Sequence, residues 1–211
     1  SAALFAMAAA PAGAQDFGEY LQAIKTLMAM RDLPRLKDPT GPALLEETIG
    51  ANLERTVAAF PDREAMVEFA TGTRWTWQEF YRDVELLARG LIAAGVEKGD
   101  RIGIWGPNSA RWTLTQYAAA NIGAILVNVN PAYRTHEFSY AMNQSGTTLL
   151  VAASSFKTSD YRGMVEETAD RNPTLERVVY VDTDDWDALV ASGETLDADV
   201  VNVRARTLDP H

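Results

Sequence analysis

The stretch that decides the fold reads GDRIGIWGPNSARWTLTQYAAANIGAILVNVNPAYR and covers residues 99–134. Its pattern predicts a strand at 102–105, a turn at 107–109, a helix at 111–122 and a second strand at 124–128. Both strands are almost continuously apolar. Strands of this kind that alternate with helices are typical of a parallel sheet with helices on both faces.

The same alternation continues towards the carboxyl terminus. Strand-like runs at 147–152 and 177–182 enclose a predicted helix at 159–171. The predicted fold class is therefore α/β, with a mostly parallel, doubly wound sheet. Four acidic residues follow at 182, 184, 185 and 187. Their spacing does not match a calcium-binding loop, so we interpret them as a solvated loop and the start of a helix.

The residues before the deciding stretch predict a helix and a hairpin. Apolar residues at helical spacing indicate a helix at 45–60, which Pro61 ends. Two β-rich runs, 65–70 and 73–75, flank Thr71-Gly72, where glycine can take the positive φ of a tight turn.

Thr76 and Glu79 stand three residues apart just before an apolar run, which is the spacing of a capping box. We interpret Glu79 as a cap and not as a catalytic carboxylate, because the sequence places no second acid or base beside it. Gly95 is the predicted left-handed end of this helix. The predicted buried stripe consists of Phe80, Val84, Leu87, Ala88, Leu91 and Ile92.

Three prolines between positions 32 and 42 predict a linker, and with it a domain boundary near residue 42. Residues 1–42 are then a tail, an amphipathic helix and a linker, and 43–211 form the α/β part. The apolar segment 1–15 lacks the positive start of a signal peptide and is too short to cross a bilayer, so no transmembrane segment is expected. The amphipathic helix can serve as core, as self-association surface or as a lipid contact.

Composition restricts the function classes. The chain has 211 residues, of which 47% are apolar and 23% charged, as in ordinary globular proteins. The net charge of -10 opposes binding to nucleic acid and to anionic lipid surfaces. The lack of cysteine excludes disulfides, a thiol nucleophile and thiolate metal sites, and it is compatible with the cytoplasmic location that we expect.

Three motifs in order carry a resemblance to a known family: WTWQEF at 75–80, GDRIGIWGPNS at 99–109 and ANIGAILVNVNPAYR at 120–134. Together they resemble the amino-terminal half of the adenylate-forming (AMP-binding) acyl-CoA ligases. The NPAYR ending and FKTSDY at 156–161 are most similar to the medium-chain fatty acyl branch. The resemblance covers residues 44–210 and implies part of the large N-terminal domain of that fold.

This resemblance implies a reaction of a fatty acid with ATP and CoA that gives acyl-CoA, AMP and pyrophosphate through an acyl adenylate, with Mg as metal cofactor. In the family, a phosphate-binding loop is expected shortly after an element such as Leu208-Asp209-Pro210. The resemblance therefore assigns no catalytic and no metal-binding residue to this chain. We expect the chain alone to be inactive, to bind none of the cofactors tightly, and to pair with the remainder of the polypeptide and, as a homodimer, with a second copy.

One site follows from the resemblance. The segment similar to 154–159 lies, in several acyl-CoA ligases, where the nucleotide end of CoA enters. By that likeness Lys157 pairs with a CoA phosphate, and Arg162 helps from one turn away. An ordinary capped helix with a solvated lysine remains open as the alternative.

Other candidate groups have structural interpretations. The turn at 103–109 is predicted to be a tight structural turn and not an anion cradle, because Pro107 removes a backbone donor. We interpret Tyr133 and Arg134 as packing and hydrogen-bonding groups at a strand end. His136 and His211 have no partners at catalytic or metal-binding spacing.

Two functions of other kinds remain open. The chain can be a non-enzymatic α/β ligand-binding or assembly module, or part of an aryl-CoA ligase or a peptide-synthetase adenylation domain, since these share the early motifs. The length of the acyl chain cannot be read from these residues.

Overall fold

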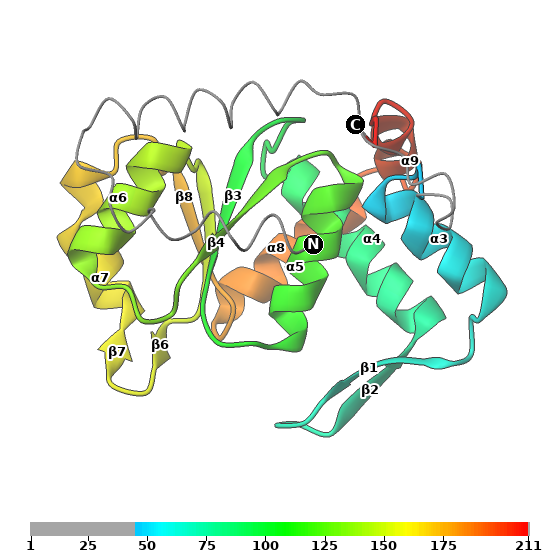
Figure 1. The fold of residues 1–211 in the computed structure, drawn as a ribbon, viewed down its shortest axis with the longest axis horizontal. Coiled ribbons are helices and arrows are strands. Elements are labelled where there is room, and N and C mark those ends of the chain that lie inside the picture. The colour runs from blue at the N-terminus through cyan, green and yellow to red at the C-terminus, as the bar shows by residue number, and fades with distance from the viewer. Residues whose placement is uncertain (1–44, 211) are drawn as a thin grey trace, which may run out of the picture. The chain divides into compact units, whose positions relative to one another are not determined.

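A computed structural model describes residues 45–210 (Figure 1). Its main sheet has the strand order β4-β3-β5-β8, and all neighbouring strands are parallel. Ile104 in the middle of the sheet lies opposite Asn128 on one side and Val151 on the other. The strands are β3 (Arg101–Trp105), β4 (Ile125–Val129), β5 (Leu149–Ala152) and β8 (Arg177–Tyr180).

Helices cover both faces of this sheet, as the sequence predicted. One layer holds α4 (Trp77–Ala93), α5 (Ala110–Asn121) and α8 (Asp184–Ser192), and the other holds α6 (Thr135–Ser145) and α7 (Tyr161–Glu167) (Figure 1). Successive side chains of a strand point to opposite faces. Val151 therefore belongs to the cluster under α4, α5 and α8, whereas its neighbour Leu150 belongs to the cluster under α6 and α7.

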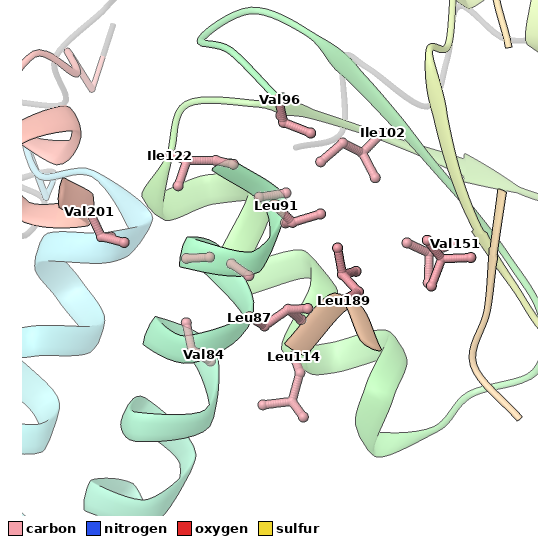
Figure 2. Close-up of a cluster of buried hydrophobic side chains, with 14 of the residues drawn as sticks. Val84, Leu87, Leu91, Val96, Ile102, Leu114, Ile122, Val151, Leu189 and Val201 are labelled. Carbon is pink, nitrogen blue, oxygen red and sulfur yellow. The ribbon is translucent and has the colours of Figure 1, made fainter. Parts of the chain in front are cut away.

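Figure 2 shows the first of these two clusters. Leu91 of α4 is completely buried and lies near Leu189 of α8 and Val151 of the sheet. At about 25 cal/mol per Å² of apolar surface, such clusters supply most of the favourable free energy of folding. Two further helices, α3 (Ile49–Ala59) and α9 (Val200–Ala205), pack against α4 and α5.

The predicted hairpin is confirmed, with β1 (Glu64–Glu68) antiparallel to β2 (Thr73–Thr76). Gly72 has a φ of 72°, the left-handed conformation that the turn requires. Strand β1 is shorter than predicted, because Phe69 and Ala70 already belong to the turn. Phe69 is 99% exposed there.

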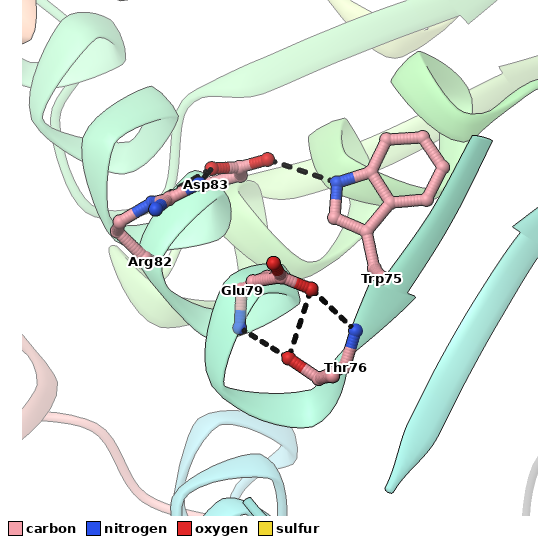
Figure 3. A network of polar contacts seen from close by, with 5 residues as sticks. All are labelled: Trp75, Thr76, Glu79, Arg82 and Asp83. Atoms are coloured by element: carbon pink, nitrogen blue, oxygen red, sulfur yellow. Dashed lines mark hydrogen bonds and ion pairs between the residues drawn. The ribbon is translucent and has the colours of Figure 1, made fainter. Parts of the chain in front are cut away.

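The capping box at the start of α4 is also confirmed (Figure 3). The Thr76 hydroxyl accepts a hydrogen bond from the Glu79 amide at 3.2 Å, and the Glu79 carboxylate accepts one from the Thr76 amide at 2.9 Å. After the helix, Gly95 has a φ of 92°, as expected for its left-handed end. Glu79 therefore acts as a cap, which accounts for the first sequence motif in structural terms.

We expect Thr76→Ala to lower the free energy of unfolding by about 1 kcal/mol, because the first turn of α4 loses its side-chain acceptor. Denaturant unfolding followed by circular dichroism measures the change. Thr76→Ser keeps the hydroxyl and is the matched control. Unfolding curves that coincide for the alanine variant and the wild type would show that the box contributes nothing.

One helix escaped prediction, and another was predicted with the wrong bounds. Helix α6 was not predicted, because polar residues dominate 135–145 and only Phe138, Ser139 and Met142 are buried. The helix predicted at 159–171 is shorter: α7 starts at Tyr161, and a 3-10 turn, η1, occupies Ala169–Arg171. In front of it, β6 (Ser155–Phe156) and β7 (Ser159–Asp160) form a second hairpin.

The acidic run after β8 behaves as predicted. Asp184, Asp185 and Asp187 lie in the first turn of α8, where the positive end of the helix dipole favours carboxylates. A second 3-10 turn, η2 (Gly193–Thr195), follows that helix. Within residues 45–210, no three acidic or histidine side chains are arranged to hold a metal ion.

Some predictions fall outside the part of the chain that the structure describes. These are the amphipathic helix and linker of residues 1–42, the boundary near residue 42 and His211. The assignment of 43–211 to one α/β part also stays a prediction. No helix between residues 45 and 210 combines the length and the apolar character needed to cross a bilayer.

Candidate functional site

The carboxyl edge of the parallel sheet is hollowed into a cleft. Ligands of doubly wound folds bind at this edge, where loops leave the strands. The cleft has a volume of about 240 Å³ and lies at the ends of β3, β5 and β8. Its lining is mostly apolar and consists of Ile104, Trp105, Gly106, Pro107, Ser109, Trp112, Val151, Ala152, Ala153, Ser155, Val181 and Asp182.

A stack of three aromatic rings supports this edge on the face of the sheet that α6 and α7 cover. The Trp105 ring stacks on Phe138 with 4.4 Å between ring centroids, and Tyr161 lies 4.2 Å away on a tilted plane. All three side chains are completely buried. The indole N–H donates to the carbonyl of Asn130 at 3.1 Å, and the Tyr161 hydroxyl donates to the carbonyl of Pro131 at 2.7 Å. The stack therefore holds the turn that follows β4.

Ser154 joins the ends of two neighbouring strands. Its amide donates to the Asp182 carboxylate at 2.8 Å, and its hydroxyl makes a short hydrogen bond to the same carboxylate. The Ser154 carbonyl also accepts from the Arg162 amide at the start of α7, at 3.0 Å. Partial burial raises the pKa of the Asp182 carboxyl, but these hydrogen bonds and the nearby Arg162 outweigh it, so that its pKa lies below the usual 3.8. Asp182 is thus an anion that ties β5 to β8.

The β6–β7 hairpin projects from this edge and carries Lys157 at its tip. Lys157 has a φ of 55°, in the left-handed region that costs residues other than glycine about 1–2 kcal/mol. The ammonium group lies 5.2 Å from the centroid of the Phe156 ring, and the side chain is exposed. Two-residue turns between antiparallel strands commonly contain a positive φ, so the conformation of Lys157 follows from its place in the turn.

Lys157 and Arg162 make separate contacts. The Arg162 guanidinium lies over the ring of Tyr180 at 4.2 Å, next to the end of β8, whereas Lys157 lies on Phe156. The hairpin separates them in the fold: Arg162 belongs to α7 and Lys157 to the turn between β6 and β7. Both side chains are exposed, and their contact with a CoA phosphate stays a prediction.

The other residues singled out in the sequence have structural contacts. Ser109 lines the cleft and caps α5 by accepting from the Trp112 amide at 3.2 Å. Arg134 donates to the Ser159 hydroxyl at 2.9 Å, and Tyr133 packs against the ring cluster, in agreement with their interpretation as packing and hydrogen-bonding groups. His136 is exposed on α6.

Sequence reasoning missed Trp105, Tyr161 and Asp182 as organisers of the edge. Trp105 ends β3, Tyr161 begins α7, and Asp182 lies between β8 and α8. The ends of strands in parallel sheets are positions where functional side chains gather. The place of these residues next to predicted strands and helices could have indicated them. Their spacing in the sequence could not, because their contact partners are distant in sequence. Trp105 and Phe138, for example, meet across 33 positions of the chain.

Comparisons with known proteins agree with this architecture. Residues 53–211 match the family of AMP-binding enzymes. The chain is 42% identical over 153 residues to the zebrafish (Danio rerio) protein named medium-chain acyl-CoA ligase ACSF2, mitochondrial. The aligned region covers 66% of this chain and 25% of the relative. The chain thus spans about a quarter of the length of the curated relatives it matches.

Solved structures give the same result. A long-chain-fatty-acid CoA ligase of Rhodopseudomonas palustris superimposes with a TM-score of 0.57 and 30% identity, over 66% of this chain and 34% of that one. The N-terminal domain of FACL13 from Mycobacterium tuberculosis gives 0.62 and 25%, over 72% and 37%. The resemblance to acyl-CoA ligases of the medium-chain branch and the fold class are thereby confirmed. This chain belongs to the family of AMP-binding enzymes.

Proposed function

We propose that this chain supplies the amino-terminal part of the large domain of an ATP-dependent ligase that joins a medium-chain fatty acid to CoA. The observation that carries the proposal is the family match over residues 53–211 on a parallel sheet with an open carboxyl edge. The names of the similar proteins, medium-chain and long-chain acyl-CoA ligases, support the reaction class.

In the proposed reaction a carboxylate oxygen attacks the α-phosphorus of ATP and pyrophosphate leaves. The thiol sulfur of CoA then attacks the acyl carbon, and AMP leaves. We assign no step of this chemistry to residues 45–210. Their proposed contribution is a scaffold for the edge of the sheet and a cation, Lys157, for a phosphate of CoA.

Lys157 fits a phosphate group for a physical reason. Its ammonium stands at the tip of a hairpin, is exposed, and has no carboxylate within ion-pair distance in the described residues. A fixed ammonium beside a phosphate makes charge-assisted hydrogen bonds without needing the planar geometry of arginine.

The experiment uses enzyme produced from the open reading frame that encodes this chain. Lys157→Ala should raise the KM for CoA about three- to thirtyfold, since one partly exposed ionic hydrogen bond is lost. Pyrophosphate exchange dependent on fatty acid should hardly change, because CoA takes no part in that step. Lys157→Arg keeps the charge and is the matched control.

Each outcome separates two explanations. An unchanged KM for CoA would show that Lys157 is a solvated surface lysine with no contact to CoA. An equal loss of activity in pyrophosphate exchange and in the CoA-dependent step would indicate damaged folding. Absence of any exchange with fatty acids of six to twelve carbons, together with ligand binding by the chain, would favour the non-enzymatic module instead. The 211-residue chain by itself should give no exchange above a buffer control.

Location and assembly remain predictions. The cytoplasmic location can be tested by cell fractionation, and it competes with the mitochondrial location printed in the names of the vertebrate relatives. Light scattering tests the predicted homodimer.

A further inference from the structure

We infer that Arg134 is a positioning residue that, through Ser159, holds the tip of the β6–β7 hairpin and so sets where the Lys157 ammonium lies. The inference rests on the proposed contact of Lys157 with a phosphate of CoA. It adds Arg134 as the residue that fixes the position of the Lys157 ammonium relative to the phosphate.

The hairpin cannot hold its own shape. Each of its strands, Ser155–Phe156 and Ser159–Asp160, has two residues. Even longer isolated two-stranded hairpins are only marginally stable in water. The position of Lys157 between these strands must therefore come from contacts with the rest of the fold.

The base of the hairpin is held on both sides. Before β6, Ser154 donates to Asp182 at the end of β8. After β7, the Tyr161 hydroxyl donates to the carbonyl of Pro131 at 2.7 Å, and its ring is part of the buried stack with Trp105. These contacts anchor the two ends of the hairpin, but they lie outside its turn.

Arg134 provides the anchor next to the turn. Arg134 is the residue that precedes the first turn of α6 and lies 25 positions before Ser159 in the sequence. Its Nη1 donates a hydrogen bond to the Ser159 hydroxyl over 2.9 Å. Ser159 pairs with Phe156 in the hairpin register, so it directly follows the turn formed by Lys157 and Thr158. Ser159 is buried, with 8% of its surface exposed, and a hydrogen bond from a charged donor is stronger than a neutral one.

Because the base is anchored independently, losing the Arg134 contact should loosen the tip without unfolding the domain. The consequence should appear in phosphate binding more than in stability. Phe156, on which the Lys157 ammonium lies, should move with the tip, since it is the partner of Ser159 in the register.

The test is a nuclear magnetic resonance titration of the 211-residue chain with adenosine 3′,5′-bisphosphate, the phosphorylated end of CoA. We expect Ser159→Ala and Arg134→Ala each to weaken binding about three- to tenfold, which is less than the full loss of a hydrogen bond with a charged partner because the ligand contact of Lys157 remains. In a Lys157→Ala background, Ser159→Ala should have almost no further effect. Thermal unfolding of each variant monitors the fold.

Ser159→Ala separates positioning from direct contact, because it removes the acceptor and leaves the arginine charge in place. If Arg134→Ala weakens binding and Ser159→Ala does not, Arg134 touches the phosphate itself and the inference is wrong. The inference also fails if Ser159→Ala weakens binding equally with and without Lys157.

Failure of the proposed function has a different signature. If Lys157→Ala does not weaken binding of the probe, or if the wild-type chain does not bind it at all, the CoA contact is wrong and the positioning role falls with it. Amide hydrogen exchange gives an independent check: Ser159→Ala should speed exchange at Phe156 and Thr158 while the amides of β5 stay protected.

Discussion

Trp105→Ala should lower the free energy of unfolding by about 4 kcal/mol, the largest loss that we expect from a single substitution in this chain. Trp105 is completely buried between Phe138 and Tyr161, so truncation leaves a cavity that the two rings can fill only partly. It also removes the donor for the Asn130 carbonyl. Since domains of this size are stable by only about 5–15 kcal/mol, the variant should be marginal.

Denaturant unfolding of purified protein measures this loss. Trp105→Phe is the matched control, because it keeps an aromatic ring in the stack and removes only the indole donor. We expect this variant to lose about 1–2 kcal/mol, consistent with a smaller ring and one carbonyl without its partner. Equal losses for the two variants would show that the hydrogen bond, and not the stack, supports the edge.

Gly90→Ala should destabilise the chain by about 2–3 kcal/mol, although alanine is the better helix former. A Cβ at Gly90 in α4 would collide with the backbone carbonyl oxygen of Leu189 in α8. Backbone atoms cannot move aside as a flexible side chain can, so the two helices must separate. The gain in helix propensity, about 1 kcal/mol, offsets only part of this cost.

Gly193→Ala probes the same contact from the other side. A Cβ at Gly193 would meet the carbonyl oxygen of Leu86 and lie 2.8 Å from the amide nitrogen of Gly90. The two alanine variants should each be destabilised, and the double variant should lose less than the sum, because the first substitution already separates the helices. A stabilised Gly90→Ala variant in denaturant unfolding would show that α4 and α8 do not pack this closely.

Much of the fold could be read from local patterns. The capping box at Thr76 and Glu79, the left-handed Gly72 and Gly95, and the apolar strands Arg101–Trp105 and Leu149–Ala152 depend on residues within a few positions of one another. Helix α6 escaped prediction because its buried face, with Phe138 and Met142, is narrow and the rest of its surface is polar.

The site was predicted less completely than the fold. Lys157 was found because a motif pointed to it, but the hairpin that carries it was predicted as the end of a loop and the start of a helix. Two strands of two residues have no periodic pattern to recognise. The hydrogen bond of Arg134 to Ser159 joins the start of α6 to the hairpin, two segments that only the tertiary fold brings together.

The sequence by itself determined the α/β class, the parallel sheet and the family, because hydrophobic periodicity, caps and turn glycines act within single elements and the motifs occur in order along the chain. Only the tertiary structure decided which side chains organise the carboxyl edge and where Lys157 stands. It also decided whether Gly90→Ala stabilises or destabilises the chain. Helix propensity favours alanine at this position, but the close approach of α8 leaves no room for its Cβ. The physical reason is the same in each case. Contacts between segments that are distant in sequence depend on how the layers pack, and a local sequence pattern does not determine how closely two packed elements approach.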